Sequence, residues 1–245
     1  MRMNTTLVVN PKGGSGKTTV TTNLASHFAA ANIATAVLDY DPQGSSLNWL
    51  RLRAPHARPI HGANAAPQRG IRLRSVEMHV PPNTEQLIVD APAGASGLLL
   101  QEMLSRTDCI LIPVGPSAID IHATANFIKD LLLVGKIRVR NIRLAVVANR
   151  VRKSMPAYQP LERFLASLNL PLLTRLADSD VYLKAAESGV GIFEMDFSMS
   201  VEEREQFLPI AHWVANRPQP RAVAEEKIVS LPLNRYAEVF RTRPR

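Results

Sequence analysis

The stretch from Val8 to Leu24, VVNPKGGSGKTTVTTNL, restricts the fold more than any other part of the chain. Residues 5–10, TTLVVN, read as a buried strand that leads into it, and apolar residues at helical spacing continue from Lys17 to about Asn32. A buried strand, a glycine-rich loop and a helix in that order are the structural context of a P-loop. We therefore expect a phosphate-binding loop between the first strand and the first helix.

The loop residues have distinct expected tasks. Glycines allow backbone N–H groups to turn inward around a polyphosphate, and the helix N-terminus adds the positive end of its dipole. These glycines are Gly13, Gly14 and Gly16. Lys17 is expected to reach the β- and γ-phosphates, and Thr18 to place its hydroxyl on Mg²⁺. The usual Gly-x-x-x-x-Gly-Lys-Ser/Thr pattern is broken, because Pro11 takes the place of the first glycine and a second lysine, Lys12, follows it.

Short apolar strands and helices alternate along most of the chain. This alternation indicates right-handed βαβ units and predicts a single-domain α/β fold, a P-loop NTPase whose mostly parallel twisted sheet has helices on both faces. Residues 54–82, which hold five prolines, receive no assignment. The expected strands are 5–10, 35–41, 86–91, 109–114, 142–149 and 171–176, and the expected helices are 17–32, 45–53, 96–105, 117–134, 158–168, 179–188 and 201–216, the last bent at Pro209.

The composition narrows the class of protein and its compartment. With 46% apolar residues, 245 residues are enough for a substantial core. The single cysteine, Cys109, excludes an internal disulfide framework and a cysteine-rich metal cluster, and its place in an apolar strand predicts a packing role. No apolar run approaches the about 18 residues of a membrane span, and the N-terminus lacks a secretory-signal pattern. We expect a cytoplasmic protein.

Basic residues are concentrated in two blocks. The formal net charge is +8. Six arginines and no acid lie between Arg51 and Arg74, and nine basic residues with one acid, Glu162, lie between Lys136 and Arg175. This distribution favours an anionic surface as partner.

Carboxylates follow two of the expected strands. Asp90 ends the run QLIVD, where a P-loop protein holds the acid that orders the magnesium shell. Asp39 and Asp41 end AVLDYD, at the carboxyl edge where ligands bind in such sheets. One of this second pair is expected to orient an attacking water, and the other to cap the turn.

The chain contains three motifs in sequence: KGGSGKTT, LDYDPQGSS and LIVDAPAG. In this order and at these distances they resemble the ParA/MinD family of deviant Walker A ATPases, and the small ParA-type partition ATPases represent the resemblance best. The likeness covers roughly residues 5–215. It implies ATP and Mg²⁺ as cofactors and slow, partner-stimulated hydrolysis. The loop residues then expected to contact the nucleotide are Lys12, Gly13, Gly14, Ser15, Gly16, Lys17, Thr18 and Thr19.

The resemblance also implies roles for single residues. Lys12 would be the signature lysine that reaches the phosphates of the other subunit of an ATP-dependent homodimer, while Lys17 serves its own nucleotide. Asp41 would position the hydrolytic water and Asp90 would be the Walker B acid, which holds Mg²⁺ through water. Asn149, at the end of a strand, resembles the position that hydrogen-bonds adenine. A second cation over the phosphates would also stabilise the charge that develops during phosphoryl transfer.

The family's partition ATPases bind nucleoid DNA without sequence preference, and the second basic block resembles that surface in placement. The DNA-binding candidates are Arg150, Arg152, Lys153 and Arg175. The implied partners are double-stranded DNA and a ParB-like or cargo-adaptor protein that stimulates hydrolysis. The cargo could be a plasmid, a chromosome origin, a carboxysome or another protein cluster, and the protein would be associated with the nucleoid.

An alternative is a MinD-like ATPase that acts at the membrane in division-site or flagellar placement. That branch uses a C-terminal amphipathic helix, whereas the apolar residues of this tail are interrupted by Pro232. A metabolic P-loop enzyme, such as a dethiobiotin synthetase, is a further alternative that would not need Lys12. We expect a ParA-like ATPase domain over residues 1–216, a loosely ordered basic tail over 217–245, and no membrane partner.

Overall fold

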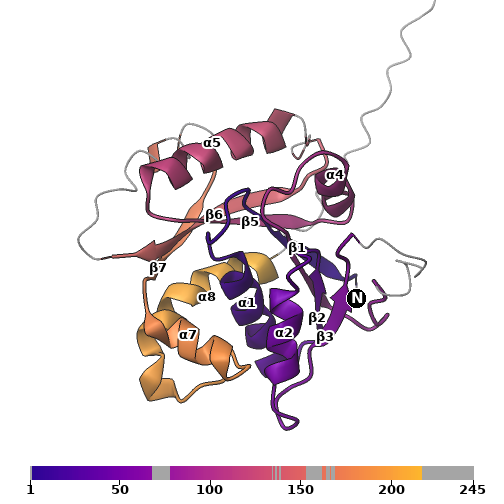
Figure 1. Ribbon diagram of the computed structural model, residues 1–245, viewed down its shortest axis with the longest axis vertical. Coiled ribbons are helices and arrows are strands. Elements are labelled where there is room, and N and C mark those ends of the chain that lie inside the picture. Colours follow the sequence, from indigo (N-terminus) through magenta and orange to yellow (C-terminus); the bar gives the residue numbers. More distant parts are fainter. Residues whose placement is uncertain are drawn as a thin grey trace, which may run out of the picture. The chain divides into compact units, whose positions relative to one another are not determined.

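The computed structural model describes residues 2–67, 78–133, 135, 137, 139–152, 162–163, 166 and 169–216 (Figure 1). Within these residues seven strands form one sheet in the order β3-β2-β4-β1-β5-β6-β7, and every neighbouring pair is parallel. The strands are β1 (Asn4–Val8), β2 (Thr35–Asp39), β3 (His61–Asn64), β4 (Gln86–Asp90), β5 (Cys109–Val114), β6 (Arg143–Val151) and β7 (Leu172–Ala177). The α/β fold class predicted from the alternation is thus confirmed.

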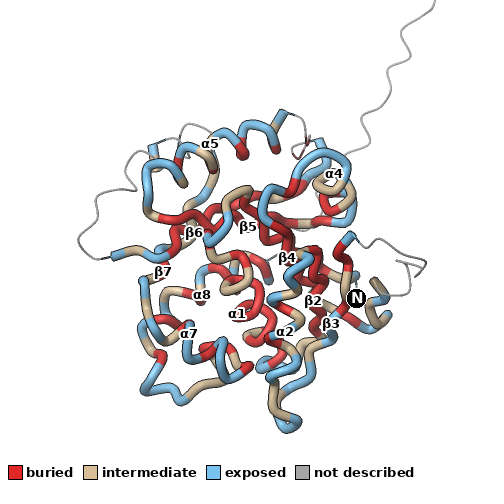
Figure 2. The backbone as a smooth tube through the Cα atoms, viewed as in Figure 1, coloured by how far each residue is buried: buried red, intermediate tan, exposed pale blue. Residues whose placement is uncertain are grey.

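Helices cover both faces of the sheet, because most strands are apolar on both sides. One core cluster joins Leu7, Val89 and Ile112 to residues of α4 (Gly97–Ser105) and α5 (Ala118–Leu133). On the opposite face Val8, Ile88 and Leu111 pack against the remaining helices (Figures 1 and 2). These are α1 (Lys17–Ala30), α7 (Asp180–Glu187) and α8 (Val201–Ala215), with α2 (Ser45–Leu52) beside them and a 3₁₀ turn, η1 (Phe197–Met199), before α8.

The structure adds one strand that the sequence pattern did not reveal. β3, with the sequence HGAN, lies inside the unassigned segment 54–82 and pairs with β2 at one edge of the sheet. It has four residues and one of them is glycine, so neither length nor apolar alternation marks it. Cys109 is buried in β5 as expected. α8 runs from Val201 to Ala215 with Pro209 inside it.

Met1–Ala215 group into one compact unit. The helix expected over 158–168 lies almost wholly outside the described residues, as does the tail 217–245, so both stay predictions. In the part of the chain that the structure describes, no helix combines the length and the apolar character that crossing a membrane requires.

Candidate nucleotide-binding site

The glycine loop leaves β1 at the carboxyl edge of the sheet and enters α1 at Lys17. Gly14 and Gly16 have φ of 72° and 95°, values that side-chain-bearing residues adopt at a cost. Gly16 also has no room for a side chain, since an added Cβ would lie 1.9 Å from Nδ2 of Asn149. The loop therefore has a backbone conformation that suits a phosphate cradle, and at Gly16 the absent side chain leaves room for Asn149.

Lys17 is folded back across the loop. The residue is only 8% exposed, and its Nζ donates a hydrogen bond of 3.1 Å to the carbonyl of Lys12. Burial lowers the pKa of Lys17, and the charges of Asp90 and Asp41 oppose that effect. The ammonium is thus hydrogen-bonded to the loop and feels the charge of two carboxylates, and a phosphate group could replace the carbonyl as its partner.

Asp90 ends β4 beside Asp39 of β2, which is its register partner. Oδ2 of Asp90 accepts a hydrogen bond of 3.0 Å from Thr18 Oγ1. Its Oδ1 is buried and has no hydrogen-bond partner among the described residues. Burial, followed by the neighbouring charge of Asp39, raises the pKa of Asp90 to about 7.

These features fit a magnesium ion. A hard cation or its water would satisfy the free Oδ1, and the hydroxyl of Thr18 is hydrogen-bonded to the other oxygen of the same carboxylate, Oδ2. The described residues contain no group of three or more His, Cys, Asp or Glu that could hold a metal. Magnesium sites of nucleotide-binding proteins usually combine one or two protein groups with phosphate oxygens and water, and Thr18 and Asp90 are suitable protein groups.

The structure separates the two carboxylates that follow β2. Asp39 is fully buried, and Oδ2 accepts hydrogen bonds from Ser46 N, Ser46 Oγ and Leu47 N at the start of α2. Its Oδ1 accepts one from Asp41 N. Asp41 is partly exposed and accepts a bond from Gln43 N at 2.9 Å. Asp39 therefore caps the turn, and Asp41 is the carboxylate of this pair that water can reach.

Lys12 is partly exposed, unlike Lys17. Among the described residues no ion pair of its ammonium is found, and its backbone N–H donates to Asn10 Oδ1 at 2.9 Å. Asn10 was not singled out from the sequence. The signal that could have found it is a polar residue that follows three apolar ones, Leu7 to Val9, and directly precedes the loop at the carboxyl edge of the sheet.

Asn149 ends the buried part of β6 and is itself buried. Its Nδ2 donates a hydrogen bond of 3.0 Å to the carbonyl of Ser15. The side chain thus lies against the phosphate loop, and a contact with a nucleotide base stays a prediction.

The basic candidates are only partly available to an anion. Arg150 is exposed and has an unusual φ of 55°. Arg152 forms an ion pair of 3.0 Å with Asp178, and Arg175 forms one with Glu162. Arg143, in the same block, lies over the Trp213 ring and donates to its carbonyl. Lys153 lies outside the described residues.

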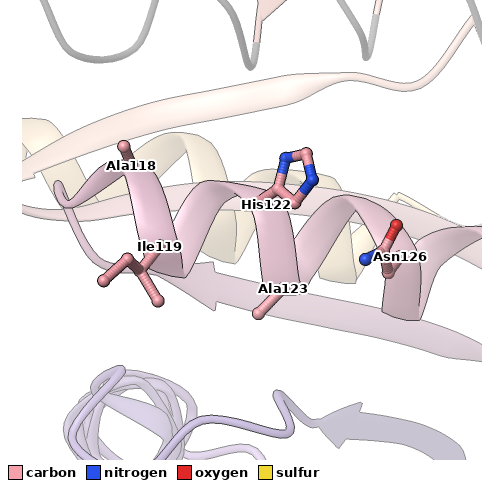
Figure 3. A pocket seen from close by; sticks show the side chains of 5 residues that line it. All are labelled: Ala118, Ile119, His122, Ala123 and Asn126. Atoms are coloured by element: carbon pink, nitrogen blue, oxygen red, sulfur yellow. The ribbon is translucent and has the colours of Figure 1, made fainter.

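Two hollows border helices of the described part of the molecule. The larger, of about 510 Å³, lies over a single helix, α5, and has a mainly apolar lining (Figure 3). It is lined by Ala118, Ile119, His122, Ala123 and Asn126. The smaller, of about 360 Å³, borders the phosphate loop at Thr18 and Thr19 and reaches Ser45 and Asn48 of α2. It is the smaller hollow that adjoins the residues described above.

Comparisons with known proteins agree with this geometry. The family model described as the CobQ/CobB/MinD/ParA nucleotide binding domain matches residues 6–231. The maintenance of carboxysome distribution protein A of Halothiobacillus neapolitanus is 26% identical over 196 residues, which are 78% of this chain and 87% of that protein.

Solved structures resemble the chain in fold. An ATP complex of Cyanothece McdA has a TM-score of 0.65 at 14% identity and covers 89% of this chain and 99% of that one. The cell division ATPase MinD of Pyrococcus furiosus has a TM-score of 0.65 at 16% identity, with 87% and 99% covered. At these identities the structures show the fold alone.

Proposed function

Because this chain belongs to the CobQ/CobB/MinD/ParA nucleotide-binding family, we propose that it is a ParA-type ATPase that positions or segregates a cargo on nucleoid DNA. The observation that carries the proposal is the contrast between the two loop lysines. Lys17 is buried and turned into its own loop, whereas Lys12 is partly exposed and held through its backbone. One loop thus has a lysine for its own nucleotide and another available to a second molecule.

We assign the substrate as ATP with Mg²⁺. The loop residues from Lys12 to Thr19 bind the phosphates, with Lys17 on the β- and γ-groups. Thr18 and Asp90 hold Mg²⁺, Asp90 through water, and the bound ion neutralises phosphate charge. Asn149 is the proposed adenine contact, supported by its place beside the loop.

Two copies would meet across their phosphate loops. Lys12 of each then contributes a positive charge to the nucleotide of the other, which offsets the repulsion between two polyphosphates. Asp41 orients the attacking water, supported by its exposure and by its effect on the pKa of Lys17. Hydrolysis removes the γ-phosphate. The Lys12 ammonium of the other subunit then loses part of the negative charge that it contacts, which weakens the dimer.

The dimer is proposed to bind double-stranded DNA without sequence preference through Arg150, Arg152, Lys153 and Arg175. A ParB-like or cargo-adaptor protein would stimulate hydrolysis and so release the ATPase beside the cargo. A relative named for carboxysome distribution favours a protein cluster as cargo, and a plasmid or chromosome origin would use the same cycle. The proposed location is the nucleoid within the cytoplasm.

Sedimentation with non-specific duplex DNA and with anionic liposomes, each with ATP, ADP or no nucleotide, tests the proposal. DNA binding that requires ATP is expected. Binding to liposomes but not to DNA would overturn it in favour of a MinD-like membrane ATPase. ATP hydrolysis with neither binding nor dimerisation would instead indicate a metabolic P-loop enzyme.

A further inference from the structure

Asn10 is buried where the phosphate loop meets β5 and α5. It lies two residues beyond the end of β1 and is 1% exposed. Nδ2 donates to the carbonyl of Pro113 at 2.8 Å and to Thr124 Oγ1 at 3.0 Å, and Oδ1 accepts from Lys12 N at 2.9 Å. One amide group thus joins the loop to β5 and α5.

The network determines the orientation of this amide. A carbonyl such as that of Pro113 can only accept, so the nitrogen must face it, and the oxygen must then face the N–H of Lys12. No other side chain of this size offers two donors and an acceptor in this arrangement. Loss of the amide would leave a buried carbonyl and the Lys12 N–H without these partners.

Lys12 is held at both of its peptide groups. Its N–H is bound by Asn10, and its carbonyl accepts the hydrogen bond from Lys17 Nζ. The preceding residue is also tied, since Gly94 N donates to the Pro11 carbonyl at 2.9 Å. Even if Lys17 left the Lys12 carbonyl for a phosphate, the hydrogen bond from the Lys12 N–H to Asn10 would still hold this residue.

We propose that Asn10 is a positioning residue for Lys12: it fixes the Lys12 backbone against β5 and α5 so that the ammonium projects toward a second subunit. The inference rests on the proposed function, in which Lys12 acts across a dimer. Thr124, buried on α5, supports it as the second anchor. Asn10 touches no nucleotide in this scheme and acts only through Lys12.

Asn10→Ala is expected to keep the nucleotide affinity of the monomer within about threefold, because Lys17 and the glycines remain. It should lower ATP-dependent dimerisation and ATP turnover by about 10- to 100-fold, as small misplacements of a catalytic group do. Light scattering, a fluorescent ATP analogue and phosphate release measure the three quantities. Thr124→Val, a milder change, should give a smaller loss of the same kind.

The other end of β1 provides a matched control. Asn4 is also fully buried, and its Nδ2 donates to Gln86 Oε1 and to the carbonyl of Val214. Asn4→Ala should lower thermal stability as Asn10→Ala does, yet keep dimerisation and turnover. Thr107→Val is the corresponding control for Thr124→Val, because it removes a buried hydroxyl that donates a hydrogen bond to the carbonyl of Met103.

The double variant Asn10→Ala/Lys12→Ala decides between positioning and a general structural role. If Asn10 acts through Lys12, the residual ATP turnover and nucleotide affinity of the double variant equal those of Lys12→Ala alone. Losses that multiply, or equal losses in Asn4→Ala, would overturn the inference. If Lys12→Ala loses the dimer and Asn10→Ala keeps it, the inference alone fails. If Lys12→Ala dimerises and hydrolyses normally, the proposed function itself fails.

Discussion

The carboxylate of Asp39 accepts a hydrogen bond of 2.9 Å from the backbone N–H of Asp41, two residues further along the chain. The same buried carboxylate binds two N–H groups and a hydroxyl at the start of α2. It therefore fixes both ends of the turn that carries Asp41. Asp39 and Asp41 have similar sequence surroundings. Because Asp39 holds the turn and Asp41 is proposed to orient water, variants of the two residues should have different effects.

Asp41→Ala is expected to retain ATP and to accumulate as a dimer, because it loses the group that orients water and keeps every phosphate ligand. Asp39→Ala should instead lower thermal stability, since several buried donors lose their acceptor. Phosphate release, light scattering and thermal unfolding compare the two. Wild-type turnover by Asp41→Ala would assign the water-orienting role to another residue.

Lys17→Ala is expected to abolish nucleotide binding, whereas Lys12→Ala keeps monomer binding and loses the ATP-dependent dimer. The reason is that, of these two lysines, Lys17 is the one buried beside the carboxylates of its own site. Fluorescent-nucleotide titration reports the first effect and light scattering the second. A Lys17→Ala protein that still binds ATP tightly would contradict the assignment of the loop.

Asp90→Asn should stabilise the nucleotide-free protein at neutral and higher pH. The pKa of Asp90 is raised to about 7, so its protonated form contributes stability that is present below about pH 4 and lost as the pH rises through about 7. Asparagine does not ionise, so it loses no stability as the pH rises, and its oxygen can still accept the hydrogen bond from Thr18. At about 1.4 kcal/mol per pKa unit, the gain at pH 8 has an upper bound of about 4 kcal/mol.

Urea unfolding of both proteins at pH 4 and pH 8 measures this gain, with the exposed Asp130→Asn as control. If the gain in unfolding free energy is the same at pH 4 and pH 8, the pKa of Asp90 is not raised. Asp90→Asn should also weaken magnesium-dependent ATP binding. In the wild-type protein that binding should strengthen from pH 6 to pH 8 as Asp90 ionises.

Arg53→Met should destabilise the fold by about 3–5 kcal/mol, because it leaves a buried carboxylate without its cation. Arg53 and Glu194 form a two-point ion pair of 2.6 and 2.8 Å, with side chains 7% and 13% exposed. Adding Glu194→Gln should recover part of the loss. Arg152→Met, at an exposed pair, should cost less than about 1 kcal/mol in the same urea unfolding experiment.

DNA affinity should fall when Arg150 and Arg152 are neutralised together, with the logarithmic salt slope reduced by about 0.9 for each lost phosphate contact. Conversely, the double variant Asp178→Asn/Glu162→Gln should raise the DNA affinity, because these acids hold Arg152 and Arg175 in ion pairs. Filter binding over a salt series measures both effects. ATP-driven dimerisation serves as the control, and no change in either variant would place the DNA surface elsewhere.

Much of the fold and the phosphate site was predictable from local patterns. The order of strand, glycine loop and helix is local, and apolar runs of three to six residues mark strands that are buried on both faces. Asp90 could be placed because it directly follows such a run. The two loop lysines were visible as a departure from a short motif, and their difference suggested separate roles.

Contacts between segments distant in the chain decided the rest. β3 is a short edge strand that pairs with β2, and its local composition did not reveal it. Asp39 and Asp41 differ because α2 returns its N–H groups to one of them, and the ion pairs of Arg152 and Arg175 depend on acids from other segments. Asn10 became a candidate only when folding brought Pro113 and Thr124 to its amide, because a hydrogen bond requires both partners at a fixed distance and a sequence displays one partner at a time.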